Sequence, residues 1–229
     1  MRRHLLTLKD ESRAVNSARF FKTGVGEYAE GDQFLGIRVP TLRALVKDNR
    51  GLCLAETIKL LPDPLHEIRL FALFLLVDQF ARADEEKRTT IYRHYLSNTS
   101  SINNWDLVDS SAYQIVGVYL QDKERRPLYR LVASSSLWER RIAMVATYQF
   151  IKAGDFADTL KLAERLLNDS EDLIHKAVGW MLREVGKRNL QVEEEFLANH
   201  YSAMPRTMLR YAIEKFPQKD RQRYLKGRV

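Results

Sequence analysis

The chain of 229 residues is poor in cysteine, proline and glycine, and these scarcities limit what it can be. Its one cysteine, Cys53, cannot form an internal disulfide, and between two leucines we expect it to be a small buried hydrophobe. Five scattered histidines with no His-Glu-x-x-His motif and no cysteine cluster predict no metal site. The six prolines and ten glycines mostly mark breaks between helices.

No apolar run approaches the roughly twenty residues that a membrane span needs. The first ten residues turn charged too soon for a signal peptide, so we expect a cytoplasmic protein that does not enter a membrane. The formal net charge is +7, which is typical of a protein with an anionic partner, nucleic acid first and an anionic membrane second. A solvated cationic surface without such a partner is the alternative.

Helical periodicity covers nearly every segment, and no pair of strands stands out. The longest irregular stretch is 23–36, which holds four glycines, and Pro40 suits the first turn of the helix after it. The sequence therefore predicts an all-α protein. The expected helices are 8–22, 40–48, 52–61, 65–82, 85–97, 105–120, 126–134, 137–152, 156–167, 171–188, 192–201, 205–215 and 220–225.

Four of these helices share a polar start and an apolar middle, and they align at Arg69, Asp109, Arg141 and Lys176. The intervals of 40, 32 and 35 residues fall in the range of two-helix solenoid repeats. We therefore expect one domain, 1–229, folded as a curved right-handed solenoid of HEAT-like antiparallel helix pairs. Because the inner helices of such an array form a concave face, the aligned positions predict a cationic surface with a single carboxylate.

The run 102–117 lies at the centre of this pattern. Trp105 and Asp109 are four residues apart, so they share one helix face, and Asn103 or Asn104 can cap the helix. Asp106 falls in the first turn, where the helix dipole favours a negative charge. Asp109 lies beyond that turn, so its carboxylate is either a satisfied structural group or a working one.

The three tryptophans, Trp105, Trp138 and Trp180, all fall on the aligned helices. Core packing is the better interpretation of Trp138. For Trp105 and Trp180 a core role and a site role stay open, since both have charged neighbours on the same face. Lys176 and Arg183 share the face of Trp180. Gly179, inside the same helix, indicates close approach of another segment.

Tryptophan faces attract cations, and a nearby carboxylate adds negative potential. Such a site stabilises developing positive charge, as in the oxocarbenium-like state of glycosidic bond cleavage. Surrounding arginines and lysines would hold a polyphosphate backbone. The combination predicts a nucleic-acid glycosidase.

Over nearly its whole length the sequence resembles the bacterial DNA alkylation repair glycosylases built from HEAT-like repeats, the AlkD-like family. The segments that carry the resemblance are 34–43 (FLGIRVPTLR), 104–110 (NWDLVDS), 137–143 (LWERRIA) and 176–188 (KAVGWMLREVGKR). The resemblance implies base excision repair of cationic N3- and N7-alkylpurines in double-stranded DNA, without a cofactor and with the base left stacked. It implies that Trp105 and Trp180 flank the sugar, that Asp109 is the catalytic carboxylate and that Arg141 holds the adjacent phosphate.

Further DNA contacts are expected at Lys176 and Arg183, at Arg38 and Arg43 beside the helix that Pro40 opens, and at Lys187 and Arg188. Surface charge is the alternative for the last four. We expect a monomer. The competing class of function is a non-catalytic HEAT-like module that binds DNA structures or an acidic protein, but a pure binder gains nothing from Asp109 in a cationic face.

Overall fold

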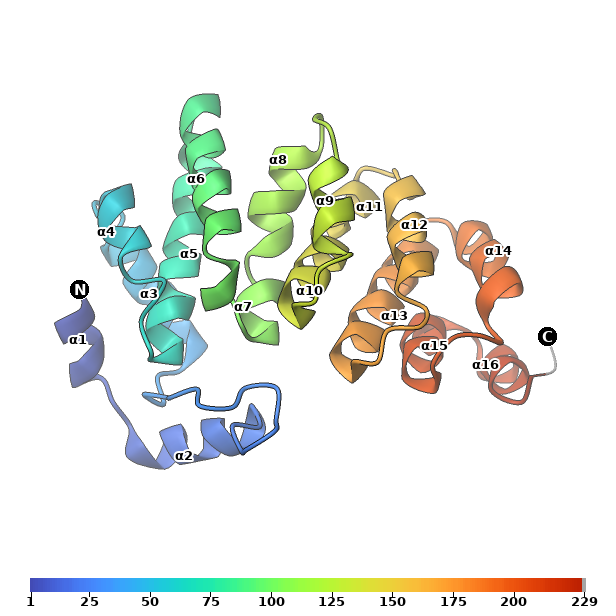
Figure 1. Cartoon of the computed structure of the whole chain (residues 1–229), viewed down its shortest axis with the longest axis horizontal. Coiled ribbons are helices and arrows are strands. Elements are labelled where there is room, and N and C mark those ends of the chain that lie inside the picture. Colours follow the sequence, from blue (N-terminus) through green and yellow to red (C-terminus); the bar gives the residue numbers. More distant parts are fainter. Residues whose placement is uncertain (228–229) are drawn as a thin grey trace. The chain divides into compact units, whose positions relative to one another are not determined.

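The computed structural model describes residues 1–227, and within them it contains helices, no β-strand and one isolated parallel bridge between Gln33 and Leu65. The all-α, helical-repeat prediction is confirmed. No helix in this part of the chain is both long and apolar enough to cross a membrane. The helices are α1 Arg2–Thr7, α2 Glu11–Phe20, α3 Val39–Asp48, α4 Leu54–Ile58, α5 His66–Arg82, α6 Glu85–Ser97, η1 Thr99–Ser101, α7 Trp105–Asp109, η2 Tyr113–Gly117, α8 Val118–Leu120, α9 Arg126–Leu131, α10 Leu137–Ala146, α11 Tyr148–Lys152, α12 Ala157–Arg165, α13 Asp172–Gly186, α14 Leu190–His200, α15 Arg206–Ala212, η3 Ile213–Lys215 and α16 Gln218–Leu225 (Figure 1).

The chain forms two compact units, Met1–Ile115 and Val116–Val229, which we call unit 1 and unit 2. A single domain over 1–229 stays a prediction, as do the curvature and the concave face, and the last two residues, 228 and 229, lie outside the described part.

Unit 1 is built on α5. This helix packs against α3, α4, α6 and α7, and every residue from Ile68 to Leu76 is buried. A helix that is apolar on all sides must be covered on all sides, which explains its central place. Its first turn, His66 to Arg69, carries the polar groups that meet the rest of the unit.

The N-terminal segment departs from expectation, because 8–22 is not one helix. The chain breaks between α1 and α2, where Asp10 caps α2 by accepting a hydrogen bond from the Arg13 N–H at 3.0 Å. α2 has no buried residue, and it leads into the irregular stretch that was expected. Glu67 holds the end of that stretch, accepting the N–H groups of Leu35 at 2.8 Å and Gly36 at 2.7 Å.

Unit 2 is built on α13, which packs against α10, α11, α12, α14 and α15. The close approach expected at Gly179 is confirmed. A Cβ atom there would lie 2.5 Å from Tyr211 Cβ and closer still to the Met208 carbonyl oxygen. Glycine therefore lets α15 lie directly against α13, the helix that carries Lys176, Trp180 and Arg183.

The prediction of one continuous helix over 105–120 is wrong in the middle of that range. α7 ends at Asp109, and after a turn the chain continues as the π-helical η2 and then α8. The cause is local. Ser111 Oγ donates to the Leu107 carbonyl at 2.5 Å, while the Ser111 N–H turns to the Val108 carbonyl at 3.1 Å. The serine hydroxyl thus replaces a helical backbone bond. Asp109 consequently occupies the last position of a short helix.

The prediction for Cys53 is also wrong. The residue is exposed and is the N-cap of α4, where its backbone N–H donates to Glu56 Oε2 at 3.1 Å. The flanking leucines suggested a buried helix interior. The acid three residues later, which closes the capping box, was the overlooked signal.

Candidate functional site

The run Asn104–Asp109 sets the first part of the site. Asn104 caps α7 as expected, its Oδ1 accepting the Trp105 N–H at 2.8 Å. Leu107 and Val108 are buried and anchor the helix, which leaves Trp105 and Asp109 half-buried. A negative charge at the carboxyl end of a helix opposes the dipole. The helix dipole therefore does not explain why a carboxylate stands at position 109.

Trp105 lies against aromatic rings from the end of α2. Its ring stacks on Phe21 with centroids 5.4 Å apart, and Phe20 meets it edge-on at 6.1 Å. Phe20 is 66% exposed, so this cluster borders solvent. Trp138 is buried, which confirms its core role. Trp105, by contrast, is held by neighbours while part of its surface stays open.

Asp109 also influences a buried tyrosine. Tyr95 is fully buried, and its hydroxyl lies 2.9 Å from Ser111 Oγ. Since the Ser111 hydroxyl already donates its hydrogen to the Leu107 carbonyl, Tyr95 is the donor in the bond between the two hydroxyls. Burial raises the pKa of Tyr95, the Ser111 contact opposes the rise, and the negative charge of Asp109 adds to it. Tyr95 therefore stays protonated.

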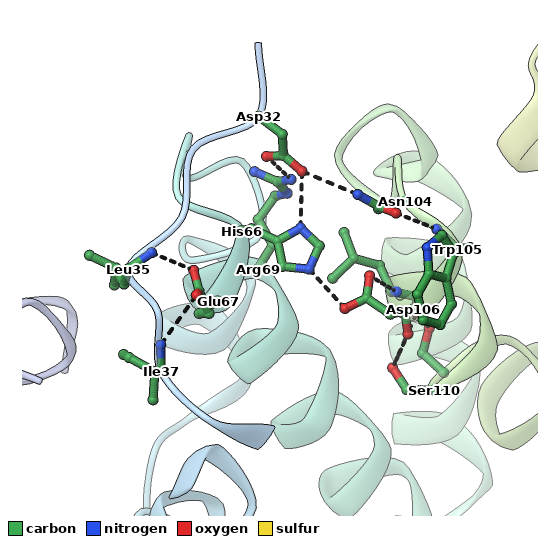
Figure 2. A network of polar contacts seen from close by, with 12 residues as sticks. Asp32, Leu35, Ile37, His66, Glu67, Arg69, Asn104, Trp105, Asp106 and Ser110 are labelled. Carbon is green, nitrogen blue, oxygen red and sulfur yellow. Dashed lines mark hydrogen bonds and ion pairs between the residues drawn. The ribbon is translucent and has the colours of Figure 1, made fainter. Parts of the chain in front are cut away.

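Figure 2 shows a polar network beside Trp105. The ring of His66, at the start of α5, lies between two carboxylates. Its Nδ1 is 3.0 Å from Asp32 Oδ2, and its Nε2 is 2.8 Å from Asp106 Oδ2. Asp32 Oδ1 accepts from Arg69 Nη2 at 2.7 Å. Asp106 thus does more than complement the helix dipole, since it ties α7 to α5.

The charged groups in this network shift the pKa values of His66 and Asp32 toward their ionised forms. Burial lowers the pKa of His66, but the hydrogen bonds and negative charges of Asp106 and Asp32 outweigh it and raise the pKa to about 9. Burial raises the pKa of Asp32, yet the bond from His66 and the charge of Arg69 bring it below its usual value. At neutral pH the group consists of two cations and two anions.

This arrangement corrects one expectation. Arg69 was aligned with Asp109, Arg141 and Lys176 as part of a cationic face, but its side chain is only 5% exposed and is paired with Asp32. Arg69 therefore forms an ion pair inside unit 1 and does not belong to a cationic surface. Arg38 and Arg43 are exposed, so a phosphate can reach them without a rearrangement. Arg38 is the N-cap residue of α3, and the Arg43 guanidinium lies 4.9 Å from the centre of the Phe74 ring.

Unit 2 holds the other expected residues. Arg141 in α10 is buried, and its Nη1 donates to the Leu173 carbonyl at the start of α13. Lys176 is half-buried and forms an ion pair with Asp172 at 2.7 Å. Both basic side chains thus have a partner near the first turns of α13.

Trp180 lies farther along α13 and is half-buried. Its ring is 6.2 Å from that of Tyr148, the first residue of α11. Lys152 and Arg188 also approach the Tyr148 ring, at 5.5 and 5.7 Å. Burial and the charge of Arg188 lower the pKa of Lys152. Two cations therefore gather around the Tyr148 ring, which lies next to Trp180.

The end of α13 is less cationic than its sequence suggests. Arg183 pairs with Glu214 and approaches Glu184. Lys187 lies 2.6 Å from Glu184 Oε1, and Arg188 donates to the Glu184 carbonyl at 2.9 Å. Lys187 and Arg188 are still exposed, so either can reach a phosphate by exchanging partners. The Glu214 pair gives Arg183 a structural task besides any DNA contact.

The sequence analysis missed His66, Asp32 and the two rings Phe20 and Phe21. The sequence offered one signal of this network, the acidic residue Asp106, which lies between Trp105 and Asp109 in the same short motif. Its partner His66 comes from 40 positions earlier, and Asp32, on the other nitrogen of that ring, from 34 positions before His66. Spacing within one helix does not reveal such distant pairs.

The sequence model of one protein family, described as DNA alkylation repair enzyme, matches residues 1–216. This range covers almost all of both units. The chain matches no curated protein sequence.

Three solved structures share the fold. A protein described as a predicted DNA alkylation repair enzyme from Enterococcus faecalis superposes with a TM-score of 0.71 at 19% identity, covering 92% of this chain and 97% of its own. AlkD2 from Streptococcus mutans gives 0.57 at 14% identity, with 91% and 99% covered. The protein smu.31 from Streptococcus mutans UA159 gives 0.55 at 16% identity, with 78% and 92% covered.

Proposed function

Since the chain belongs to the family of DNA alkylation repair enzymes, we propose that it is a DNA N-glycosylase that removes cationic N3- and N7-alkylpurines from double-stranded DNA. Such a reaction is the first step of base excision repair. We assign the bond cleavage to Asp109, Trp105 and Trp180. Phosphate contacts are assigned to Arg141, whose buried guanidinium must leave the Leu173 carbonyl to reach DNA, and, with smaller contributions, to Lys176, Arg183, Arg38, Arg43, Lys187 and Arg188.

The position of Asp109 carries this proposal. The carboxylate ends α7, where it opposes the helix dipole, and it lies one turn from a half-buried tryptophan. A protein that only bound DNA would be weakened by an anion here, because it repels phosphate. A glycosylase gains from it, because the sugar becomes positively charged as the base departs.

The chemistry needs no partner acid if the base is already cationic. An alkylated N3 or N7 gives the purine a positive charge, so the base leaves without being protonated. One carboxylate then suffices to stabilise the sugar cation or to orient the attacking water. The indole faces of Trp105 and Trp180 add further attraction for positive charge once water is excluded.

Experiment can distinguish the role of the two half-buried tryptophans from that of a tryptophan in the core. We expect Trp105→Ala and Trp180→Ala to slow single-turnover excision strongly while lowering stability only modestly. Trp138→Ala is the matched control, because loss of a buried tryptophan costs about 3–5 kcal/mol. Thermal unfolding beside excision rates makes the comparison. If either variant is destabilised as much as Trp138→Ala but excises normally when folded, that tryptophan belongs to the core.

For Arg141 we expect a change in salt dependence. If its guanidinium neutralises a phosphate, Arg141→Ala should weaken binding to all sequences and reduce the slope of log K against log salt by about one. Arg126→Ala, which removes an exposed arginine paired with Glu124, serves as the control. An unchanged slope for Arg141→Ala would mean that the residue has a structural role within unit 2, where it holds the Leu173 carbonyl.

A panel of single-lesion duplexes tests the choice of substrate. We expect release of 7-methylguanine and 3-methyladenine, and no release of uracil, hypoxanthine or ethenoadenine, because neutral bases need protonation or a specific pocket. Activity should persist with a chelator present, since the sequence has no metal-ligand motif. Efficient uracil removal would show that a proton donor exists, and the one-carboxylate mechanism would fail.

A further inference from the structure

His66 is the most enclosed charged group of unit 1. Its side chain is 2% exposed and that of Asp32 is 4% exposed. Ionised carboxylates only accept hydrogen bonds, so a ring that faces a carboxylate oxygen through each nitrogen must carry a proton on both. With both carboxylates ionised, this geometry describes an imidazolium, and the raised pKa of His66, about 9, agrees with it.

This imidazolium joins three segments that are far apart in the chain. Asp32 comes from the irregular stretch after α2, His66 opens α5, and Asp106 lies in the first turn of α7 (Figure 2). Asp106 Oδ1 also accepts the N–H of Leu107 at 2.9 Å. Asn104 Nδ2 lies 3.5 Å from Asp32 Oδ2, so the residue that caps α7 meets the same carboxylate. The first turn of α7 is held at both its cap and Asp106.

The same network supports the indole of Trp105 through stacked rings. The Phe21 ring lies 5.0 Å from the His66 ring and 5.4 Å from the Trp105 ring. Phe34 stacks on His66 at 4.6 Å and on Phe21 at 5.1 Å. Trp105 is thus fixed through its backbone by Asn104, through its neighbour Asp106 by His66, and through its face by Phe21.

We propose that the Asp32–His66–Asp106 network is a positioning device for Trp105, and that the proton on His66 sets the indole in the geometry that excision needs. This inference rests on the proposed function. Loss of the proton leaves two carboxylates facing a neutral ring that can donate to only one of them. The ring then releases either Asp106 or Asp32, the carboxylate that the Asn104 cap contacts. The first turn of α7 is loosened directly or through its cap, and Trp105 loses its fixed place.

The direction of the pH effect follows from the charges around His66. Asp32, Asp106 and Arg69 lie in the network. Arg13, Arg38 and Glu67 line the cavity of about 380 Å³ beside it. Because the pKa of His66 in the folded chain lies above its ordinary value of 6.5, protonated His66 stabilises unit 1 fully below pH 6.5. That contribution is lost as the pH rises through about 9.

The test labels the three tryptophans with 5-fluorotryptophan and follows their fluorine resonances from pH 6 to pH 10, with Trp105→Phe to assign the signal. We expect the Trp105 resonance to move with a midpoint near pH 9. In His66→Gln it should stay constant at a displaced position, and the Trp138 signal should not move in either protein. His4→Gln, an exposed histidine of the same unit, should behave as the parent chain. A Trp105 resonance that is constant with pH in the parent chain overturns the proposal.

Single-turnover excision by His66→Gln, compared with the parent chain at each pH from 6 to 9, gives the functional readout. We expect a loss of tenfold or more at pH 7 that shrinks toward pH 9, with DNA affinity unchanged, because a misplacement of about 1 Å can cost on the order of a hundredfold. Asp106→Asn keeps the side-chain shape and should show the same loss, which protects the test if His66→Gln folds poorly. Equal rates for the well-folded variants and the parent chain overturn the proposal. If the parent chain excises no alkylpurine, the proposed function fails, and the fluorine titration alone decides the positioning role.

Discussion

The Asp109→Asn variant is expected to lose excision by a hundredfold or more under single-turnover conditions, and to bind DNA as well as the parent chain or more tightly. Removing one preorganised group that stabilises transition-state charge typically costs about 10²–10³ in rate. The asparagine keeps the shape of the side chain but cannot offset the positive charge on the sugar. Binding should not suffer, because the substitution removes an anion that repels phosphate.

Asp122→Asn is the matched control, since it removes one exposed carboxylate outside the proposed site. It changes the net charge as Asp109→Asn does, so any general electrostatic effect on DNA binding appears in both variants. Release of 7-methylguanine by Asp109→Asn at near the parental rate would refute the catalytic assignment. The chain would then fit better with a non-catalytic module that recognises DNA structure.

The second large effect is expected at Gly179. In Gly179→Ala the new methyl group would lie 2.5 Å from Tyr211 Cβ and closer still to the Met208 carbonyl oxygen, so α15 must move away from α13. Overpacking of this kind costs about 1–3 kcal/mol and occasionally more. Because one of the opposing atoms belongs to the backbone, we expect the upper end of that range, about 3 kcal/mol. At 2–4 °C per kcal/mol, the melting temperature should fall by roughly 6–12 °C.

Gly51→Ala provides the comparison, because a Cβ atom at Gly51 would meet nothing within 4 Å. We expect its stability to stay within about 0.5 kcal/mol of the parent chain. Thermal unfolding of the three proteins in one buffer decides the matter. If Gly179→Ala melts with the parent chain, α13 and α15 are less tightly packed than the structure shows.

Local pattern was enough to predict most helices. The apolar residues of α13 recur at helical spacing, those of α5 form a long run through its middle, and Pro40 marks the first turn of α3. The close approach at Gly179 was also predictable, because glycine inside a long helix costs stability and indicates a neighbouring segment that needs the space. The breaks at Asp10 and at Ser111 were not predicted, since there short polar side chains compete with the backbone for hydrogen bonds.

The pairing of charges was the part that sequence could not supply. Arg69 and Lys176 looked equivalent on the aligned helices, yet one is buried against Asp32 and the other forms a half-exposed pair within its own helix. Likewise, nothing near His66 in the chain reveals that Asp106 lies beside it. Contacts between residues far apart in the chain depend on how helices pack, and helical periodicity does not encode them.

The most direct measurement is the release of free bases from methylated duplex DNA by the purified chain. Under an excess of enzyme, the account predicts that 7-methylguanine and 3-methyladenine appear in the supernatant while the DNA strands stay intact until alkali cleaves the abasic sites. Chelator should not change the result. Tight binding of the same DNA with no base released above the spontaneous rate would contradict the proposed function.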